Sequence, residues 1–423
     1  MIIRNGFVID PMTGREENAD IIVEAGRIVK ICPVGQIKNT ADKEIDAKGM
    51  IVAPGLVDVH VHFRDPGFTY KEDIETGAKA ALAGGFTSVV LMANTKPAVD
   101  NEETLSYVIE KGKTTDLRIY TCAAVTKGLG GKEMVDVDDL FEKGAVGFTD
   151  DGIPIMDAEL MRKAMEATAK LNVPISLHEE DPGLITNNGI NRGAASEHFG
   201  IGGSPREAEI TLIERDLQLA LETGAVLNIQ HISTKEGVEL VRKAKNDPRG
   251  KNIHAEATPH HFTLTQEAAI KHGTLAKMNP PLREEADRQA IIKGLQDGTI
   301  DIIATDHAPH SKEEKEKPIT EAPSGIIGLE TALSLGVTEL VDKNLLTMKE
   351  LIAAMSTNPA GMYGLEAGSI EEGKAADLVI FAPSESYTVE SFLSKSSNSP
   401  FVGQTLKGVV HYTIVNGEIV YQK

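Results

Sequence analysis

The feature that most constrains this 423-residue chain is a repeat of short apolar runs that alternate with amphipathic stretches. Eight runs cover residues 56–62, 87–94, 117–125, 145–151, 173–178, 225–231, 252–259 and 300–306. Between them, stretches such as 158–171 and 207–222 carry apolar residues at three- and four-residue spacing, which predicts helices. Strands that alternate with helices are typical of a parallel sheet. Eight such units predict a closed (β/α)8, TIM-like barrel of the α/β class.

The two ends of the chain have a different sequence pattern from the middle. Residues 1–52 and 368–423 contain short β-like runs broken by Gly and charged residues. Asn416-Gly417 lies between two apolar runs, which predicts a β-hairpin. Neither end alone has enough strands to bury a core. We therefore expect both ends to build one small β-sandwich domain beside a barrel formed by residues 53–367.

Polar residues stand at the carboxyl ends of the apolar runs, where barrels of this kind place their active sites. His60 and His62 are two apart on one strand, so their side chains are expected on the same face. Asp150 adjoins Asp151, and strand alternation indicates only that one of the two faces inward. Histidines and carboxylates suit Zn²⁺, as one ion or a bridged pair. The polar residues at the strand ends are His60, His62, Asn94, Asp151, His178, His231 and Asp306.

The charge balance bears on the class of partner. Lys and Arg total 43 against 63 for Asp and Glu, and a net charge of −20 disfavours nucleic acid and anionic membranes. A local Arg or metal ion can still reverse the potential inside a cleft, so a small anionic substrate fits. The two cysteines, Cys32 and Cys122, provide no disulfide framework. Without a signal-peptide pattern or an apolar run of about 18 residues, a cytoplasmic protein with no membrane span is expected.

Two stretches carry a resemblance to a known family. DVHVHFRDP resembles the first signature of the dihydroorotase family, and ATDHAPHSKEEK resembles its second. The segments LMANTKP, FTDDG, HISTKE, TPHHFTLT, KMNPPLR and GIIGLET occur in the family's order, so the resemblance covers nearly the whole chain. It implies a metal-dependent amidohydrolase barrel with a flanking β domain, of the bacterial type I that stands apart from multifunctional polypeptides.

The resemblance also implies residue roles. The implied metal ligands are His60, His62, Asp151, His178, His231 and Asp306, and Asp306 doubles as the catalytic acid/base. The implied substrate contacts are His62, Arg64, Asn94, Asn279, His310, Ser324 and Gly325. Many amidohydrolases bridge two metals with a carboxylated lysine where this chain has Asp151, so one or two zinc ions remain open. Two further histidines, His260 and His261, come directly after the end of the seventh run and are expected to orient the ligands.

The implied reaction is the reversible, zinc-dependent cyclisation of N-carbamoyl-L-aspartate to dihydroorotate and water in de novo pyrimidine (UMP) synthesis. Arg64 is expected to pair with the exocyclic carboxylate, which hydantoins and dihydropyrimidines lack. The alternatives are an allantoinase, a hydantoinase or dihydropyrimidinase, or a non-catalytic amidohydrolase-like scaffold. A homodimer is the default expectation, and association with aspartate carbamoyltransferase stays open.

A long polar connection, residues 311–324, leads from His310 to Gly325. Its charges and two prolines argue against a buried helix. Loops of this length without apolar periodicity are typically functional lids or disordered segments. We expect the loop to be mobile in the free enzyme and to become ordered over bound substrate.

Overall fold

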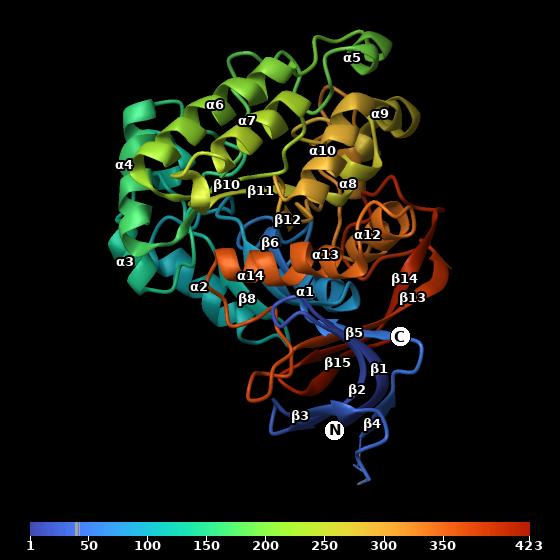
Figure 1. Ribbon diagram of the computed structural model, residues 1–423. Coiled ribbons are helices and arrows are strands. Elements are labelled where there is room, and N and C mark those ends of the chain that lie inside the picture. Colours follow the sequence, from blue (N-terminus) through green and yellow to red (C-terminus); the bar gives the residue numbers. More distant parts are fainter. Residues whose placement is uncertain (39–40, 42) are drawn as a thin grey trace.

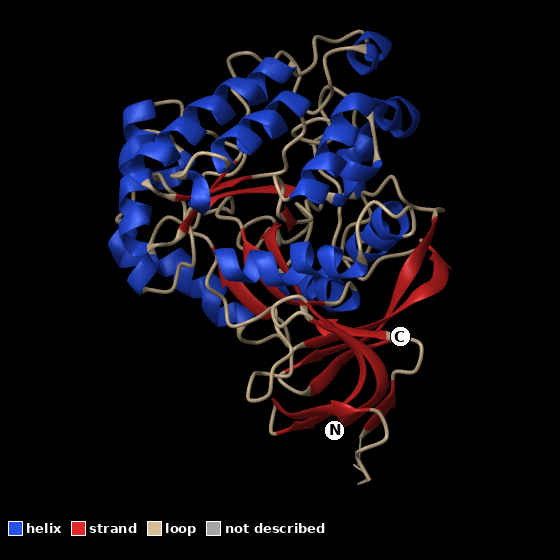
Figure 2. Cartoon of the chain, in the orientation of Figure 1, coloured by secondary structure: helices blue, strands red, loops and turns tan. Residues whose placement is uncertain are grey.

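The computed structural model describes residues 1–38, 41 and 43–423, which form two connected parts. The upper part in Figure 1 is a ring of helices around strands, and the lower part is mostly strand and holds both termini. Figure 2 shows the strands of the upper part enclosed by helices. The expectation of an α/β barrel with a small β domain made from both chain ends is confirmed.

Seven regular strands and one extended segment form the barrel wall in the described part of the chain. The strands are β6 (Leu56–Val61), β7 (Phe86–Leu91), β8 (Arg118–Thr121), β9 (Pro174–Leu177), β10 (Val226–Ile229), β11 (Ile253–Ala257) and β12 (Ile302–Ile303). They pair in parallel as β6-β7-β8 and β9-β10-β11-β12. Phe148, in the predicted fourth strand, bridges Ala123 and Ile175 and so joins the two sheets, and a bridge from Val61 to His307 closes the ring.

Helix α4 (Ala158–Leu171) shows how the sequence sets the helices around the barrel. Its amino end is capped by the Asp157 side chain, which accepts hydrogen bonds from two backbone N–H groups, and its carboxyl end stops at Asn172 in a left-handed conformation (φ 53°). The buried residues Met161, Ala164, Met165 and Thr168 follow three- and four-residue spacing. The predicted helices at 158–171 and 207–222 are thereby confirmed, the second as α6 (Arg206–Thr223).

The remaining helices connect the strands and cover the outside of the barrel (Figure 1). They are α1 (Ile74–Ala83), α2 (Glu102–Gly112), α3 (Val137–Glu142), α5 (Ala194–Phe199), α7 (Lys235–Lys245), α8 (Pro259–Thr263), α9 (Gln266–His272), α10 (Glu285–Asp297), α11 (Lys312–Lys315), α12 (Ala332–Gly336), α13 (Met348–Ile352) and α14 (Asn358–Met362). Because helices cover the wall, every residue of β6 and β7 is buried, as expected for a parallel barrel.

The small domain is a sheet that neither chain end could form alone. Its strands are β1 (Ile2–Asp10), β2 (Arg15–Glu24), β3 (Arg27–Pro33), β4 (Glu44–Asp46), β5 (Ile51–Pro54), β13 (Leu378–Thr388), β14 (Thr405–Val415) and β15 (Glu418–Gln422). Strand β5 pairs with β1 on one side and with β13 on the other, and Ile3, Val8, Leu378 and Ile414 share one apolar core. The predicted hairpin is confirmed, since Asn416 and Gly417 turn with φ of 50° and 77° between β14 and β15.

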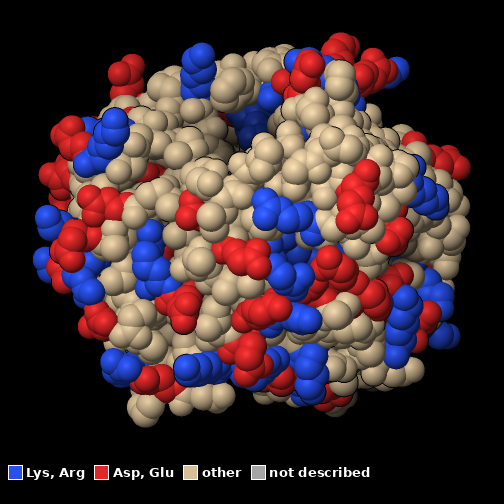
Figure 3. Space-filling view, turned by 90° about the horizontal axis from the view of Figure 1, so that it is seen from above, with Lys and Arg blue, Asp and Glu red and all other residues tan. Residues whose placement is uncertain are grey.

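Among the described helices, none is both long and apolar enough to cross a membrane. Cys32 and Cys122 are buried and form no disulfide with each other. Figure 3 shows basic and acidic side chains interspersed over one face of the molecule. The whole chain has a net charge of −20, but this face shows no large patch of acidic side chains alone.

Candidate metal centre

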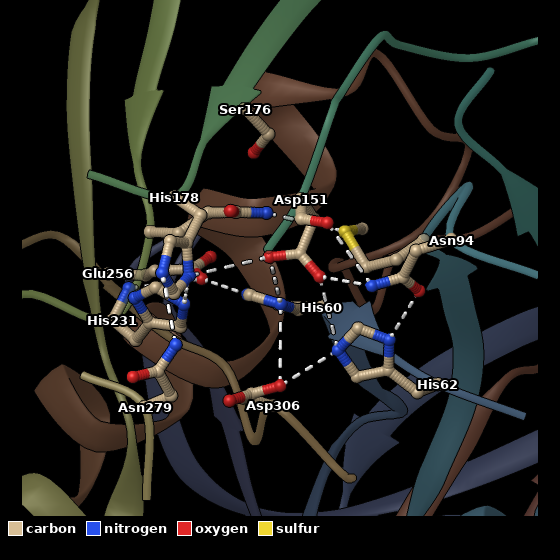
Figure 4. Close-up of polar contacts among 12 residues, drawn as sticks. His60, His62, Asn94, Asp151, Ser176, His178, His231, Glu256, Asn279 and Asp306 are labelled. Carbon is tan, nitrogen blue, oxygen red and sulfur yellow. Dashed lines mark hydrogen bonds and ion pairs between the residues drawn. The ribbon is translucent and has the colours of Figure 1, made fainter. Parts of the chain in front are cut away.

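The polar residues at the strand ends converge at one end of the barrel (Figure 4). His60 belongs to β6 and His62 follows it, while His178 comes directly after β9. His231 and Asp306 lie two and three residues beyond β10 and β12. The structure thus brings together the six residues predicted as ligands, and each reaches the centre from the carboxyl end of its strand.

Three overlapping groups of these residues have ligand atoms within 4.8 Å of one another. The groups are His60–His62–Asp151, Asp151–His178–His231 and His60–His231–Asp306. Asp151 belongs to two of them: its Oδ2 lies 3.4 Å from His62 Nε2, and its Oδ1 lies 3.8 Å from His178 Nδ1. Asp306 Oδ1 lies 2.9 Å from His62 Nε2 and 3.4 Å from His60 Nε2. A shared carboxylate of this kind can bridge two ions.

Hydrogen bonds behind the first two histidines fix which ring nitrogen faces the centre. His60 Nδ1–H donates to Glu256 Oε1 at 2.5 Å, and His62 Nδ1–H donates to Asn94 Oδ1 at 2.9 Å. Both acceptors are oxygens, so each histidine in its neutral form directs the Nε2 lone pair toward the centre. Asn94 also donates to Asp151 Oδ2 at 2.9 Å, and thereby orients two members of the centre at once.

His178 is held in a comparable way. His178 Nε2 donates to Glu180 Oε2 at 3.2 Å, which leaves Nδ1 facing His231 Nε2 at 3.0 Å. Two ligands of a tetrahedral zinc ion with bonds of 2.0–2.1 Å are separated by roughly 3.3 Å. The donor separations of 3.0–3.8 Å among His178, His231 and Asp151 match that geometry.

Two buried polar atoms at the centre lack a hydrogen-bond partner among the described residues. They are His60 Nε2 and His231 Nδ1, on side chains that are almost fully buried. Unpaired buried nitrogens are costly unless something satisfies them. A set of imidazoles and carboxylates with unsatisfied nitrogens fits a borderline ion such as Zn²⁺. The Cys122 thiol is not a candidate metal ligand, because burial raises its pKa to about 12 and a ligand would have to be the thiolate.

Electrostatics couples the histidines to the carboxylates. Burial alone would lower the pKa of His60, but Glu256 and Asp306 outweigh that effect and hold the pKa well above its usual value. Burial would raise the pKa of Asp151, yet His60, His62 and His178 hold the pKa well below its usual value. The carboxylate of Asp151 therefore stays charged, as a metal ligand requires.

The choice between Asp150 and Asp151, which the sequence left open, is decided by the contacts of Asp150. Its carboxylate accepts from the backbone N–H groups of Val125 and Thr126 at 2.7 and 3.1 Å and from the Thr126 hydroxyl. These bonds tie Asp150 to the loop after β8. Asp151 is the residue that points into the centre (Figure 4).

Backbone conformation also marks the site. Nine non-glycine residues of the described chain have positive φ, and three of them are predicted site residues. They are Arg64, His231 and Asp306, with φ of 60°, 29° and 46°. Side chains disfavour this region, and such conformations cluster at functional sites where the surroundings enforce them.

The centre opens into a cleft of about 360 Å³, at the lower end of the range for small-molecule sites. Besides ligand residues, the cleft is lined by Arg64, Asn94, Asn279, His310, Ser324 and Gly325. Arg64 Nε donates to Pro309 O at 3.3 Å, whereas its two terminal nitrogens bond no described residue. Burial lowers the pKa of Arg64, opposed by Asp306 and Asp151. The cleft therefore holds a guanidinium with free donors beside the candidate metal centre.

The other predicted substrate contacts differ in whether their polar atoms already have hydrogen-bond partners. Asn279 Oδ1 is buried and has no partner among the described residues. His310 Nε2 donates to Ser324 O at 2.8 Å, and Gly325 N donates to Lys277 O at 2.9 Å. A side chain at Gly325 would clash, since a Cβ there would lie 2.7 Å from Ala308 O. Asn279 can accept from a ligand directly, while His310 and Gly325 are committed to shaping the cleft wall.

Sequence reasoning missed several residues that organise the site. Glu256 and Glu180 orient the histidines, and a charged residue inside the apolar seventh run was the available signal for Glu256. Asn398 accepts from His310 N at 3.0 Å and donates to Ala308 O and Gly325 O at 2.9 and 3.0 Å. Asn398 comes from the C-terminal region, 73 residues from Gly325 and 88 from His310, and no local pattern pointed to it.

The expectation that His260 and His261 orient the ligands is wrong. His261 bonds the Thr258 hydroxyl at 2.8 Å and Pro280 O at 3.0 Å, and His260 Nε2 has no partner among the described residues. Burial lowers the pKa of His261 to about 4. The side chains that take the orienting role are carboxylates and an amide, because these accept the N–H that a ligating histidine must donate.

Comparisons with known proteins agree with this geometry. The family model described as Amidohydrolase family matches residues 51–420. The dihydroorotase of Clostridioides difficile (strain 630) is 57% identical over 421 residues, which cover 100% of this chain and 99% of that protein. The dihydroorotase of Clostridium acetobutylicum is 52% identical over 424 residues, with 100% and 99% covered.

Two solved structures share the fold. An L-hydantoinase (dihydropyrimidinase) from Arthrobacter aurescens superposes with a TM-score of 0.89 at 26% identity, covering 100% of this chain and 96% of the other. A dihydropyrimidinase from Brevibacillus agri NCHU1002 gives a TM-score of 0.86 at 23% identity, covering 100% and 95%. At 23% identity, the second likeness bears on the fold alone.

Proposed function

Because this chain belongs to the amidohydrolase family, and full-length relatives at 48–57% identity are dihydroorotases, we propose that it is a dihydroorotase. The reaction is the reversible conversion of N-carbamoyl-L-aspartate into dihydroorotate and water, a step of pyrimidine synthesis. The observation that carries the proposal is a free guanidinium, Arg64, in the same cleft as a cluster of histidines and carboxylates.

We propose that the centre holds a pair of zinc ions, for which Asp151 would be the shared ligand. Support comes from the two ligand groups that share this carboxylate, and from the unsatisfied Nε2 of His60. His60 and His62 would hold one ion, and His178 and His231 the other. Bound zinc supplies Lewis acidity, which activates water as a nucleophile at neutral pH and polarises the scissile carbonyl.

Asp306 is the proposed acid/base. Its Oδ1 lies at the centre, 2.9 Å from His62 Nε2, and Asp306 lines the cleft. In ring opening, the carboxylate takes a proton from the attacking water and delivers it to the departing ring nitrogen. In ring closure the same carboxyl group supplies the proton for the water that leaves.

Arg64 is the proposed specificity residue. Its terminal nitrogens can donate two parallel hydrogen bonds to the exocyclic carboxylate of dihydroorotate. Asn279 Oδ1, buried without a partner, can accept from a ring N–H. A neutral hydantoin or dihydropyrimidine would leave the guanidinium unpaired, which disfavours these substrates even though the fold resembles that of hydantoinases.

We also propose a cytoplasmic enzyme that forms a homodimer. The two unpaired, buried cysteines suit a reducing compartment, and two-fold homo-oligomers are the commonest closed assemblies. Association with aspartate carbamoyltransferase stays a prediction. Light scattering of the purified chain, alone and mixed with that enzyme, would test both assembly predictions.

The test of the function is a comparison of turnover on dihydroorotate, dihydrouracil and allantoin by the same zinc-loaded preparation. We expect kcat/KM for dihydroorotate to exceed the other two by at least about a hundredfold, since the neutral substrates leave a buried charge unpaired. Preference for a neutral ring would contradict the assignment. A chain that turns over none of the three would favour the scaffold alternative.

A further inference from the structure

A buried lysine amine lies behind the wall of the substrate cleft. Lys315, in α11, is only 5% exposed, and its Nζ donates to Pro323 O at 2.9 Å and to Gly325 O at 3.1 Å. No carboxylate of the described chain lies within ion-pair distance of this amine. The Lys315 amine therefore bonds backbone carbonyls and no carboxylate, which is unusual for a buried lysine.

A second lysine makes the same kind of contact from another direction. Lys277, after α9 in the chain, is 6% exposed, and its Nζ donates to Ile319 O and Ala322 O at 2.7 Å each. Its own backbone carbonyl accepts from Gly325 N at 2.9 Å. Like Lys315, it has no carboxylate partner within ion-pair distance in the described chain.

The four carbonyls belong to one loop, residues 319–325, whose last members line the cleft. Ala322, Pro323, Ser324 and Gly325 all face the cleft that contains the metal centre. The carbonyls of Ile319, Ala322 and Pro323 accept from no other described donor. A buried carbonyl without a donor is costly, so without the lysines this loop would have to expose its backbone to water.

The amines can serve in either protonation state. Burial lowers the pKa of Lys315 to about 7 and also lowers the pKa of Lys277. A neutral amine still carries two N–H groups, and each lysine has two carbonyls to satisfy. The contacts therefore do not depend on the titration of either group.

We propose that Lys315 and Lys277 are positioning residues that hold the 319–325 loop in the shape that closes the substrate cleft. The two amines act through the backbone of Ser324 and Gly325 and touch no reacting atom. This proposal rests on the dihydroorotase function, because it names the part of that site that the lysines shape.

This arrangement bears on the expectation for residues 311–324. The segment contains a one-turn helix, α11, with a Ser311–Glu314 capping box. The expectation of no buried helix is not contradicted, because Lys312 and Glu313 are exposed and only Lys315 of this helix is buried. Whether the loop opens in the free enzyme stays a prediction, and the lysines are the contacts that opening would have to break.

The first test compares the variants Lys315→Met and Lys277→Met with Lys312→Met. Lys312 lies in the same helix, its side chain is 77% exposed, and its ion-pair partner is Glu316 at 3.7 Å, so it is a matched control. We expect the KM for dihydroorotate to rise at least about tenfold in the first two variants, with kcat less affected and bound zinc unchanged. Amide hydrogen exchange over residues 319–327 should accelerate in both, and Lys315→Arg should restore part of the loss.

Unchanged KM and unchanged exchange in Lys315→Met would overturn the proposal. Unaltered protein provides a second test if the variants fold poorly. Acetic anhydride labelling, read by mass spectrometry, should modify Lys315 and Lys277 far more slowly than Lys312. Equal labelling rates would also overturn the proposal. Because exchange and labelling need no turnover, a failure of the dihydroorotase assignment would be recognised separately, as absent activity in the parent chain.

Discussion

Replacing Glu256 with glutamine should weaken metal binding without removing any predicted ligand. Glu256 is fully buried, and its Oε1 accepts from His60 Nδ1 at 2.5 Å and from His231 N at 3.3 Å. Its other oxygen accepts from Asn228 Nδ2 at 3.0 Å. The carboxylate thereby orients His60 and makes its Nε2 a stronger electron-pair donor.

The magnitude follows from what glutamine can and cannot replace. Its amide has the same shape, so no cavity forms, and its oxygen can still accept from His60. It carries no charge, however, and its NH₂ group would face the Asn228 amide donor. Loss of such an outer partner typically costs 10–100-fold in metal affinity. This range corresponds to about 1.4–2.7 kcal/mol at 25 °C.

The assay is a zinc titration against a competing chelator, with hydrolysis of dihydroorotate followed at limiting and at excess zinc. We expect a 10–100-fold weaker zinc affinity in Glu256→Gln and recovery of activity at excess zinc. Glu209→Gln is the control, because Glu209 is equally buried but accepts from Ser233 N at 2.8 Å instead of from a predicted ligand. Zinc affinity within about twofold of the parent chain would show that Glu256 does not strengthen His60 as a ligand.

Four further outcomes are expected. Asp306→Asn should lower kcat by 10²–10⁴-fold in a steady-state assay, and retention of more than about a hundredth of the activity would contradict the acid/base role. Arg64→Lys should raise the KM for dihydroorotate about tenfold, because an ammonium cannot form the paired hydrogen bonds, and an unchanged KM would argue against carboxylate recognition. Asn398→Ala should lower the free energy of unfolding in urea by about 3 kcal/mol, since it leaves two buried backbone groups without a partner and removes one of the two donors to Gly325 O, whereas exposed Asn188→Ala should have little effect. Burial raises the pKa of Glu330 to about 7 from 4.5, so its contribution to stability should be lost as the pH rises through that interval, and Glu330→Gln should remove this part of the pH dependence of urea unfolding.

Much of the fold could be predicted because its signals are local. Buried parallel strands require apolar runs, and covering helices require one apolar face, so α4 was predicted with its observed bounds. The hairpin at Asn416-Gly417 followed from the backbone freedom of those two residues. The fourth barrel strand was predicted as regular, yet only Phe148 bridges to its neighbours, since the irregularity depends on packing against other strands.

In the candidate site, too, residues with a local sequence signal could be predicted and residues positioned by distant contacts could not. His60 and His62 were predicted because strand alternation and the position at a strand end both act within a few residues. The partners that orient them are brought near by the barrel closing, and Glu256 lies 196 residues from His60 in the chain. The contacts of Lys315 and Asn398 are with backbone groups, which leave no trace in side-chain patterns. Residue type and spacing therefore predicted the cluster of histidines and carboxylates, but not the groups that position them.

We propose that the centre around Asp151 is the zinc site of a dihydroorotase. The rate of dihydroorotate ring opening by chelator-stripped protein, measured as zinc is added back in steps, tests this proposal. We expect negligible turnover without zinc and a rise that levels off at two equivalents per chain. Full turnover by the metal-free chain would rule out a zinc-dependent reaction, and saturation at one equivalent would rule out a ligand role of Asp151 toward two ions.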